Sequence, residues 1–182
     1  MLLFALAVPD LQKPPGERRS LQNLPEAKVV KVIDGDTLDV LLKGEEIRIR
    51  LLGIDTPEKG EPLYKEAKER LAELASAVVY VEADAEKKDR YGRYLFWLYS
   101  EDGQLINAEL VKEGLADCYY RPSFRGRRHA LELLYQAFEA CQKKIGIWSE
   151  SYGKVALIAP NLVFLILPFG FYSQEAGFFY FF

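Results

Sequence analysis

The chain has few of the residues that build soft-metal and disulfide sites. Its 182 residues include one histidine, His129, and two cysteines, Cys118 and Cys141, which are not spaced as a CxxC motif. Zinc is usually held by several closely spaced histidines and cysteines, so this composition argues against a zinc centre. We expect the two cysteines to be free thiols or ordinary packing residues.

The chain also lacks an excess of positive charge. Its 24 lysines and arginines are outnumbered by 27 acidic residues, which gives a net charge of −3. Proteins that bind nucleic acid tightly without sequence preference are usually basic, because their cations displace counterions from phosphates. The charge balance therefore argues against a high-affinity scaffold, but not against an enzyme that needs only a local basic cleft and a metal.

Composition divides the chain into three parts. Residues 1–26 read as a tail and a proline-rich linker, residues 27–150 as one folded domain, and residues 151–182 as an apolar tail. The apolar start has no positively charged segment and no clear small-residue cleavage site, so we favour a tail over a signal peptide.

The apolar tail is open to three interpretations. Residues 155–172 carry no charge, and this length approaches the roughly 20 residues of a membrane-spanning helix, but prolines interrupt it. The segment either associates with a membrane, adds strands to the domain or to a partner, or has no defined role. On these grounds we expect a secreted or membrane-associated protein rather than a cytoplasmic one. No signal for oligomerisation is visible.

Hydrophobic periodicity predicts three strands, a helix, two strands and two further helices. The predicted ranges are 27–33, 37–43, 45–52, 63–76, 77–83, 93–99, 108–113 and 128–143. The first three strands are too close together for parallel crossovers, so the order predicts a small antiparallel β-barrel with packed helices, in the mainly β (α+β) class. We expect Asn107 to cap the short helix. The last helix should bury the stripe Leu131, Leu134, Tyr135 and Phe138.

Three short segments concentrate charge at predicted strand ends and loops. They are DGDT at 34–37, Arg50 with DTPE at 55–58, and DRYGR at 89–93. Each alone is also typical of a turn or a helix start. Together they contain the parts of a phosphodiesterase site.

The chemistry of these residues explains that interpretation. Calcium prefers oxygen ligands, which Asp36 and Asp55 supply. Glu58 is placed to orient or deprotonate an attacking water. The planar guanidinium groups of Arg50 and Arg93 match phosphate oxygens and stay charged.

The order of these motifs resembles the staphylococcal nuclease family over about residues 27–150. The matching segments are VVKVIDGDTLDV, RIRLLGIDTPE, KKDRYGRYLFWLY, LINAELVKEGLA and KKIGIWSE. The resemblance implies a five-stranded OB-type β-barrel with three helices. It also implies a calcium-dependent endonuclease that hydrolyses DNA and RNA with little sequence preference and leaves 3′-phosphate products.

The resemblance also implies roles for individual residues. Asp36 and Asp55 match the calcium-binding carboxylates, Thr56 the residue that offers a backbone carbonyl to the ion, and Glu58 the general base. Arg50 and Arg93 match the phosphate-contacting arginines. Asp34 belongs to the motif either as a supporting residue or as a turn former.

The chain departs from the family in two places. The loop after Glu58 is short, and only one of two expected tyrosine positions is filled, by Tyr120. Next to it, Arg125, Arg127 and Arg128 either form a lip that docks the nucleic-acid backbone or belong to a solvated loop. The alternative function is a catalytically inactive module of the same fold that binds nucleic acid or peptide.

Overall fold

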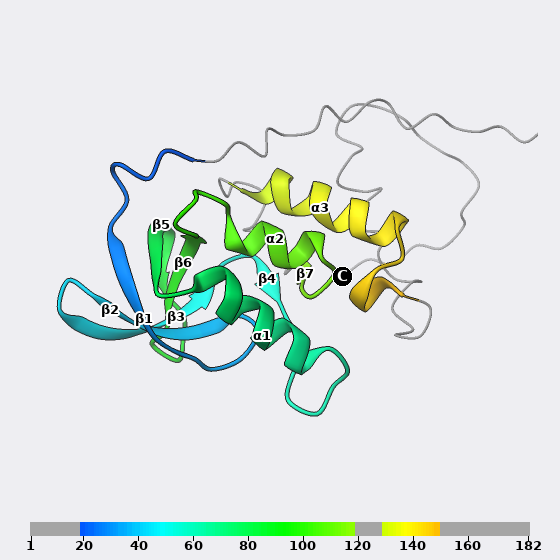
Figure 1. Cartoon of the computed structure of the whole chain (residues 1–182), viewed down its shortest axis with the longest axis horizontal. Coiled ribbons are helices and arrows are strands. Elements are labelled where there is room, and N and C mark those ends of the chain that lie inside the picture. Colours follow the sequence, from blue (N-terminus) through cyan, green and yellow to red (C-terminus); the bar gives the residue numbers. More distant parts are fainter. Residues whose placement is uncertain (1–18, 119–128, 150–182) are drawn as a thin grey trace, which may run out of the picture.

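The computed structural model describes residues 19–118 and 129–149 (Figure 1). Tyr120, Arg125, Arg127, Arg128 and the apolar tail lie outside the described residues. No helix within the described ranges is long and apolar enough to cross a membrane. Cys118 and Cys141 are free and half-buried.

Five strands close into a barrel, as predicted. They are β1 (Glu26–Val32), β2 (Thr37–Leu42), β3 (Glu45–Leu51), β5 (Val78–Lys88) and β6 (Tyr94–Tyr99), and they pair in the order β1-β2-β3-β6-β5, with β1 returning to β5. A second, two-stranded sheet joins β4 (Ile54–Asp55) to β7 (Asp117–Cys118). The sequence analysis did not predict these two short strands.

The barrel is mixed, so the prediction of an antiparallel barrel was wrong in one pairing. β3 and β6 run parallel, whereas the other four pairs are antiparallel. Five is an odd number, and a closed ring with an odd number of strands cannot alternate direction throughout. The long connection from β3 to β6, which includes α1 and β5, permits the parallel pair.

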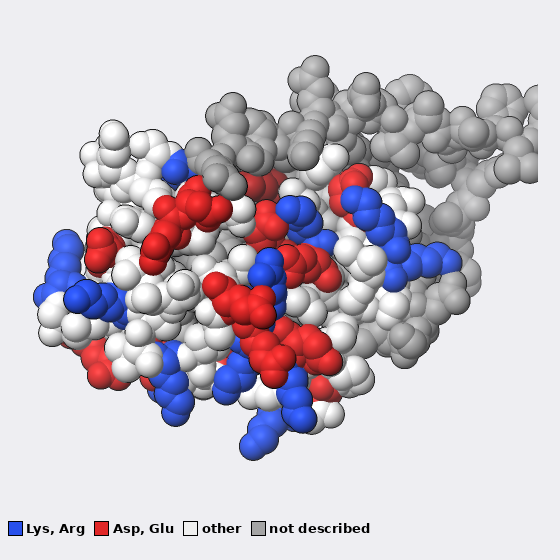
Figure 2. All heavy atoms as spheres, in the orientation of Figure 1, with Lys and Arg blue, Asp and Glu red and all other residues white. Residues whose placement is uncertain are grey.

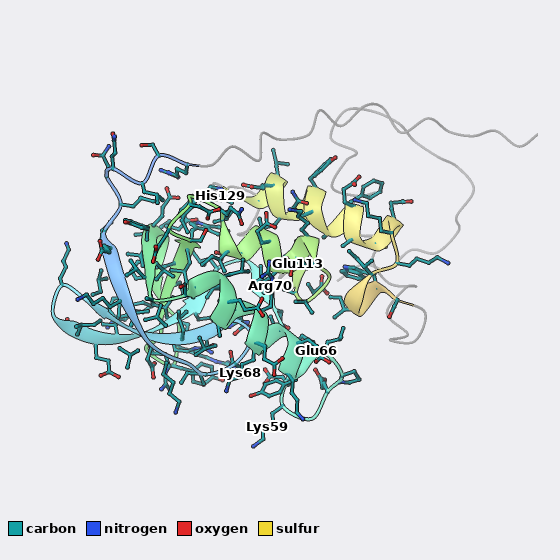
Figure 3. All side chains as sticks on the ribbon, viewed as in Figure 1. Lys59, Glu66, Lys68, Arg70, Glu113 and His129 are labelled. Carbon is teal, nitrogen blue, oxygen red and sulfur yellow. The ribbon has the colours of Figure 1, made fainter. Side chains whose placement is uncertain are left out.

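Three helices cover the barrel (Figure 1). They are α1 (Tyr64–Ala75), α2 (Ile106–Lys112) and α3 (Ala130–Gln142), followed by the 3₁₀ turn η2 (Gly146–Trp148). α1 buries Ala67, Leu71 and Ala75. Arg70 on α1 points to Glu113 after α2, and their side chains form two hydrogen bonds of 2.8 Å that join the two helices (Figure 3).

Two predictions about the helices were wrong. α3 buries Ala130, Leu133, Ala137 and Ala140, while Leu131 is 75% exposed. The small alanines allow a close approach to the neighbouring helix, and apolar periodicity gave them too little weight. Asn107 does not cap α2 but lies inside it, fully buried, where it donates to the Leu52 carbonyl and accepts from the backbone N–H of Leu98.

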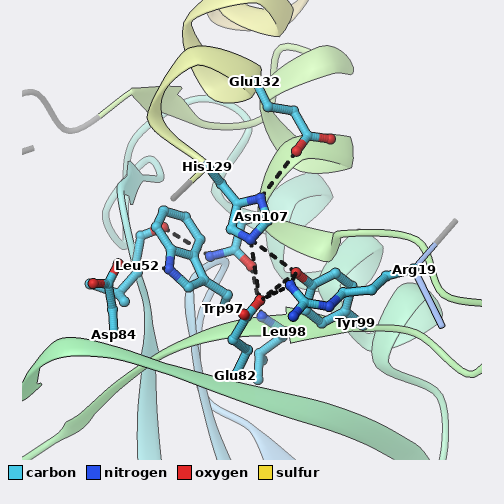
Figure 4. Close-up of polar contacts among 10 residues, drawn as sticks. All are labelled: Arg19, Leu52, Glu82, Asp84, Trp97, Leu98, Tyr99, Asn107, His129 and Glu132. Carbon is cyan, nitrogen blue, oxygen red and sulfur yellow. Dashed lines mark hydrogen bonds and ion pairs between the residues drawn. The ribbon is translucent and has the colours of Figure 1, made fainter. Parts of the chain in front are cut away.

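A polar network joins the start of the described chain to the barrel and to α3 (Figure 4). The buried carboxylate of Glu82 on β5 accepts hydrogen bonds of 2.6 Å from both Arg19 and Tyr99. His129, directly before α3, lies 2.9 Å from the Tyr99 hydroxyl and 3.2 Å from Glu82. The histidine therefore occupies the start of α3 and fixes this helix to the barrel.

Candidate active site

The DGDT segment forms a tight turn between β1 and β2. The side chain of Asp34 accepts a hydrogen bond from the backbone N–H of Asp36, so Asp34 acts here as a turn former. A side chain at Gly35 would overlap Thr56 and Ala67. Glycine at this position therefore lets the turn lie directly against the DTPE segment and α1.

Asp36 is a buried carboxylate, with only 6% of the residue exposed. One of its oxygens accepts hydrogen bonds of 3.2 Å from the backbone N–H and the hydroxyl of Thr56, and the other accepts one from the Thr37 hydroxyl. Burial raises the pKa of Asp36 to about 6, although the positive charge of Arg50 opposes the shift. The ionised form of a carboxylate in such surroundings is stabilised by any cation placed beside it.

Arg50 joins Asp36 to Asp55. Its Nη1 lies 2.6 Å from Asp36 and also donates to the Ile54 carbonyl, and its Nη2 lies 2.8 Å from Asp55. The DGDT and DTPE segments, which are separated by the whole β2–β3 hairpin, are thus held at one guanidinium group. Asp55 itself is 53% exposed, so the group is open to solvent on that side.

The donor atoms at this point suit a hard cation such as calcium. Asp36 and Asp55, which meet at Arg50, offer only oxygen, and calcium prefers oxygen over nitrogen or sulfur. Across the described ranges, no group of three or more acidic, histidine or cysteine side chains gathers around one point. Calcium takes about six to eight oxygens, which is more than these residues offer.

Glu58 and Arg93 line a cavity of about 730 Å³, which we call the Glu58–Arg93 cavity. Its lining residues are Asp39, Glu46, Ile47, Arg48, Glu58, Tyr91, Gly92 and Arg93. Arg48 in this wall lies two residues before Arg50 on β3, whereas Asp36, Arg50 and Asp55 are not among the lining residues. The volume is in the range of small-ligand sites.

Arg93 is oriented by a neighbour that the sequence analysis treated only as part of a turn. One oxygen of Asp89 accepts from the backbone N–H groups of Tyr91 and Arg93, and the other lies 2.7 Å from the Arg93 Nε. Desolvation works against ionisation of Asp89, but its hydrogen bonds with Arg93 and Tyr91 outweigh this and lower its pKa. The ion pair uses Nε, and among the described residues Nη1 and Nη2 make no hydrogen bond, although the guanidinium lies 5.6 Å from the centre of the Tyr91 ring.

Glu58 lies on an exposed turn and lines this cavity. Its backbone N–H donates to the carboxylate of Glu61, and its carbonyl accepts from the Glu61 N–H. Lys59 projects outward from the same loop (Figure 3). Figure 2 shows acidic and basic side chains interspersed over the visible face.

These observations agree with comparisons to known proteins. Residues 48–150 match the family model described as "Staphylococcal nuclease homologue". The chain belongs to the staphylococcal nuclease family. It is 36% identical over 131 residues to a protein named "Micrococcal nuclease" from Shigella flexneri, an alignment that covers 68% of this chain and 73% of that protein.

Two further proteins align with the chain to a similar extent. A "Thermonuclease" from Staphylococcus hyicus is 40% identical over 133 residues, covering 67% of this chain and 75% of that protein. "Protein ParB" from Escherichia coli is 36% identical over 133 residues, covering 69% and 73%. The family predicted from the motif order is thereby confirmed.

Proposed function

We propose that the chain is a calcium-dependent endonuclease that hydrolyses DNA and RNA with little sequence preference. The observation that carries this proposal is the meeting of Asp36 and Asp55 at Arg50, in a structure that also brings Glu58 and Arg93 to one cavity. Relatives named nucleases and thermonucleases support it.

The residues divide the work as follows. Asp36, Asp55 and the Thr56 carbonyl would hold calcium, which when bound supplies positive charge that offsets the negative charge developing on the phosphate. Glu58 takes the proton of the attacking water as its oxygen forms a bond to phosphorus. The bond from phosphorus to the 5′ oxygen breaks and this oxygen takes up a proton from solvent water, so the products carry a 3′-phosphate and a 5′-hydroxyl.

The arginines stabilise the same reaction electrostatically. Arg93 presents its Nη1 and Nη2 groups while Asp89 holds its Nε, so little reorientation is needed to contact two phosphate oxygens. Arg50 is held by Asp36 and Asp55, and its positive charge would act on the side of the phosphate that faces these carboxylates. Fixed positive groups at the point where charge develops lower the barrier more than mobile ones.

Beyond the described residues, Tyr120 and the arginines at 125, 127 and 128 remain proposed substrate contacts. Residues 155–172 remain a proposed membrane-association segment. Both assignments depend on sequence alone.

Digestion of single-stranded DNA and RNA tests the proposal, with calcium, with chelator, and with analysis of product ends. We expect cleavage only with calcium, and 3′-phosphate ends. If folded wild-type protein binds the oligonucleotides but does not cut them in any of these conditions, the protein is the inactive binding module instead.

A further inference from the structure

Arg48 is a cavity residue for which the proposed reaction has no use so far. It lies on the same face of β3 as Arg50, opposite the buried Ile47 and Ile49. Its side chain is 52% exposed, yet it lines the Glu58–Arg93 cavity together with Glu58 and Arg93. The guanidinium therefore stands in the wall of the site rather than on a remote surface.

Asp39 fixes the orientation of this guanidinium. The two residues are direct cross-strand partners, and Asp39 accepts hydrogen bonds of 2.7 Å from Nε and 2.9 Å from Nη2 of Arg48. These bonds with Arg48 lower the pKa of Asp39, so the pair stays ionised. Nη1 of Arg48 has no partner among the described residues, and because the guanidinium is rigid and planar, its direction is set by the pair.

The position of Arg48 suits a second phosphate of the same strand. Residues two apart on one face of a strand are roughly 7 Å apart. That span is comparable to the separation of neighbouring phosphates in an extended single strand. A nucleic acid whose scissile phosphate lies at Arg50 and Arg93 would then bring an adjacent phosphate to Arg48.

We propose that Arg48, oriented by Asp39, is a binding site for the phosphodiester next to the scissile one. The site deepens the proposed nuclease function and rests on it for the direction of the strand. Its ligand class is a single-stranded oligonucleotide with at least two phosphates. The alternative is that Arg48 and Asp39 form only an exposed salt bridge, which would contribute little to stability and nothing to oligonucleotide binding.

Binding of a fluorescent single-stranded oligonucleotide tests the site without depending on catalysis. Kd is measured over a series of salt concentrations with calcium present, in a Glu58→Gln background that slows cleavage. Each phosphate contact on a single strand contributes about 0.7 to the slope of log Kd against log salt. We expect Arg48→Gln to reduce the slope by about 0.7 and to raise Kd roughly tenfold, as for one lost charged contact.

Two matched variants control for charge and structure. Lys112→Gln removes one positive charge from a side chain that is 53% exposed and paired with Glu109 on α2. This variant should keep the wild-type slope. Arg48→Lys keeps the charge and should also keep the slope. An unchanged slope in Arg48→Gln, or an equal fall in Lys112→Gln, would overturn the site.

Kinetics then place the contact relative to the scissile bond. We expect Arg48→Gln to lower kcat/KM for a trinucleotide roughly tenfold, through a higher KM. For a dinucleotide with a single phosphodiester, kcat/KM should change less than about twofold. An equal loss on both substrates would place Arg48 at the scissile phosphate and overturn the proposal. If wild-type protein cuts neither substrate but the binding slopes differ as expected, the nuclease function fails and the phosphate site stands.

Discussion

Replacing Asp36 by asparagine should make the protein more stable while it removes one of the charges proposed to hold calcium. The pKa of Asp36 is raised from 3.8 to about 6 in the folded state, chiefly by burial. An acid whose pKa is higher in the folded than in the unfolded state destabilises the fold once it ionises. The free energy of unfolding of the wild type should therefore fall as pH rises through this interval.

The magnitude follows from the size of the shift. One pH unit corresponds to about 1.4 kcal/mol, so at pH 7 the ionised Asp36 costs about 3 kcal/mol. Asparagine avoids this cost and keeps the shape. Its oxygen can still accept from the Thr56 N–H and from Arg50, and its NH₂ group can donate to Thr37, whose hydroxyl is free to turn.

The assay is urea unfolding in chelator, followed by the fluorescence of the buried Trp97 and Trp148, at intervals from pH 4 to pH 7. We expect the free energy of unfolding of Asp36→Asn to be about 3 kcal/mol higher than that of the wild type at pH 7. The two values should converge near pH 4. Asp55→Asn is the matched control, because it touches the same guanidinium but is largely exposed; its effect should stay below about 0.5 kcal/mol. A variant that is less stable at pH 7, or a difference that does not shrink on acidification, would refute the reasoning.

Two further predictions concern the helices. A Cβ at Gly146, where φ is +57°, would overlap the carbonyl of Gly114, so Gly146→Ala should lower the free energy of unfolding by more than about 3 kcal/mol. Gly44→Ala, at a positive φ with open space around it, should cost only about 1 kcal/mol in the same urea titration. Arg70→Gln removes the bidentate link to Glu113 and should cost about 1 kcal/mol without changing the rate of DNA cleavage. An equal loss in both glycine variants, or a slower reaction in Arg70→Gln, would contradict these accounts.

The sequence was enough to predict the elements that carry strong local patterns. Apolar and charged residues alternate in the sequence of β3, and the structure buries Ile47 and Ile49 and turns Arg48 and Arg50 to the opposite face. All eight predicted strands and helices are present, with their ends moved by a few residues. These elements are specified by local periodicity and turn residues, which a single sequence displays directly.

Features set by contacts between distant segments could not be predicted. The buried face of α3 consists largely of alanines, which give a weak hydrophobic signal, so the larger Leu131 attracted the prediction instead. Asn107 resembles a helix cap in sequence, and only the packing of α2 against β6 and Leu52 explains its buried position. Tertiary contacts overrode local preference in both cases.

In the candidate site too, the sequence predicted which residues matter but not the contacts between them. Motif order identified Asp36, Arg50 and Asp55 as candidates, but not that the two carboxylates share one guanidinium. The orienting roles of Asp89 and Asp39 were also missed, although Asp89 stands in the quoted DRYGR motif and Asp39 follows DGDT closely. An acidic residue facing an arginine across a hairpin is a usable signal once strand register is known.

The most direct test of the central claim is the single-turnover rate of cleavage of a single-stranded oligonucleotide in calcium, measured for Glu58→Gln and Glu46→Gln. Both glutamates line the Glu58–Arg93 cavity and both variants lose one negative charge there. The account predicts a loss of about 100-fold or more for Glu58→Gln, the usual contribution of a general base, and less than about threefold for Glu46→Gln. A Glu58→Gln variant that cuts at the wild-type rate, or an equal loss in Glu46→Gln, would contradict it.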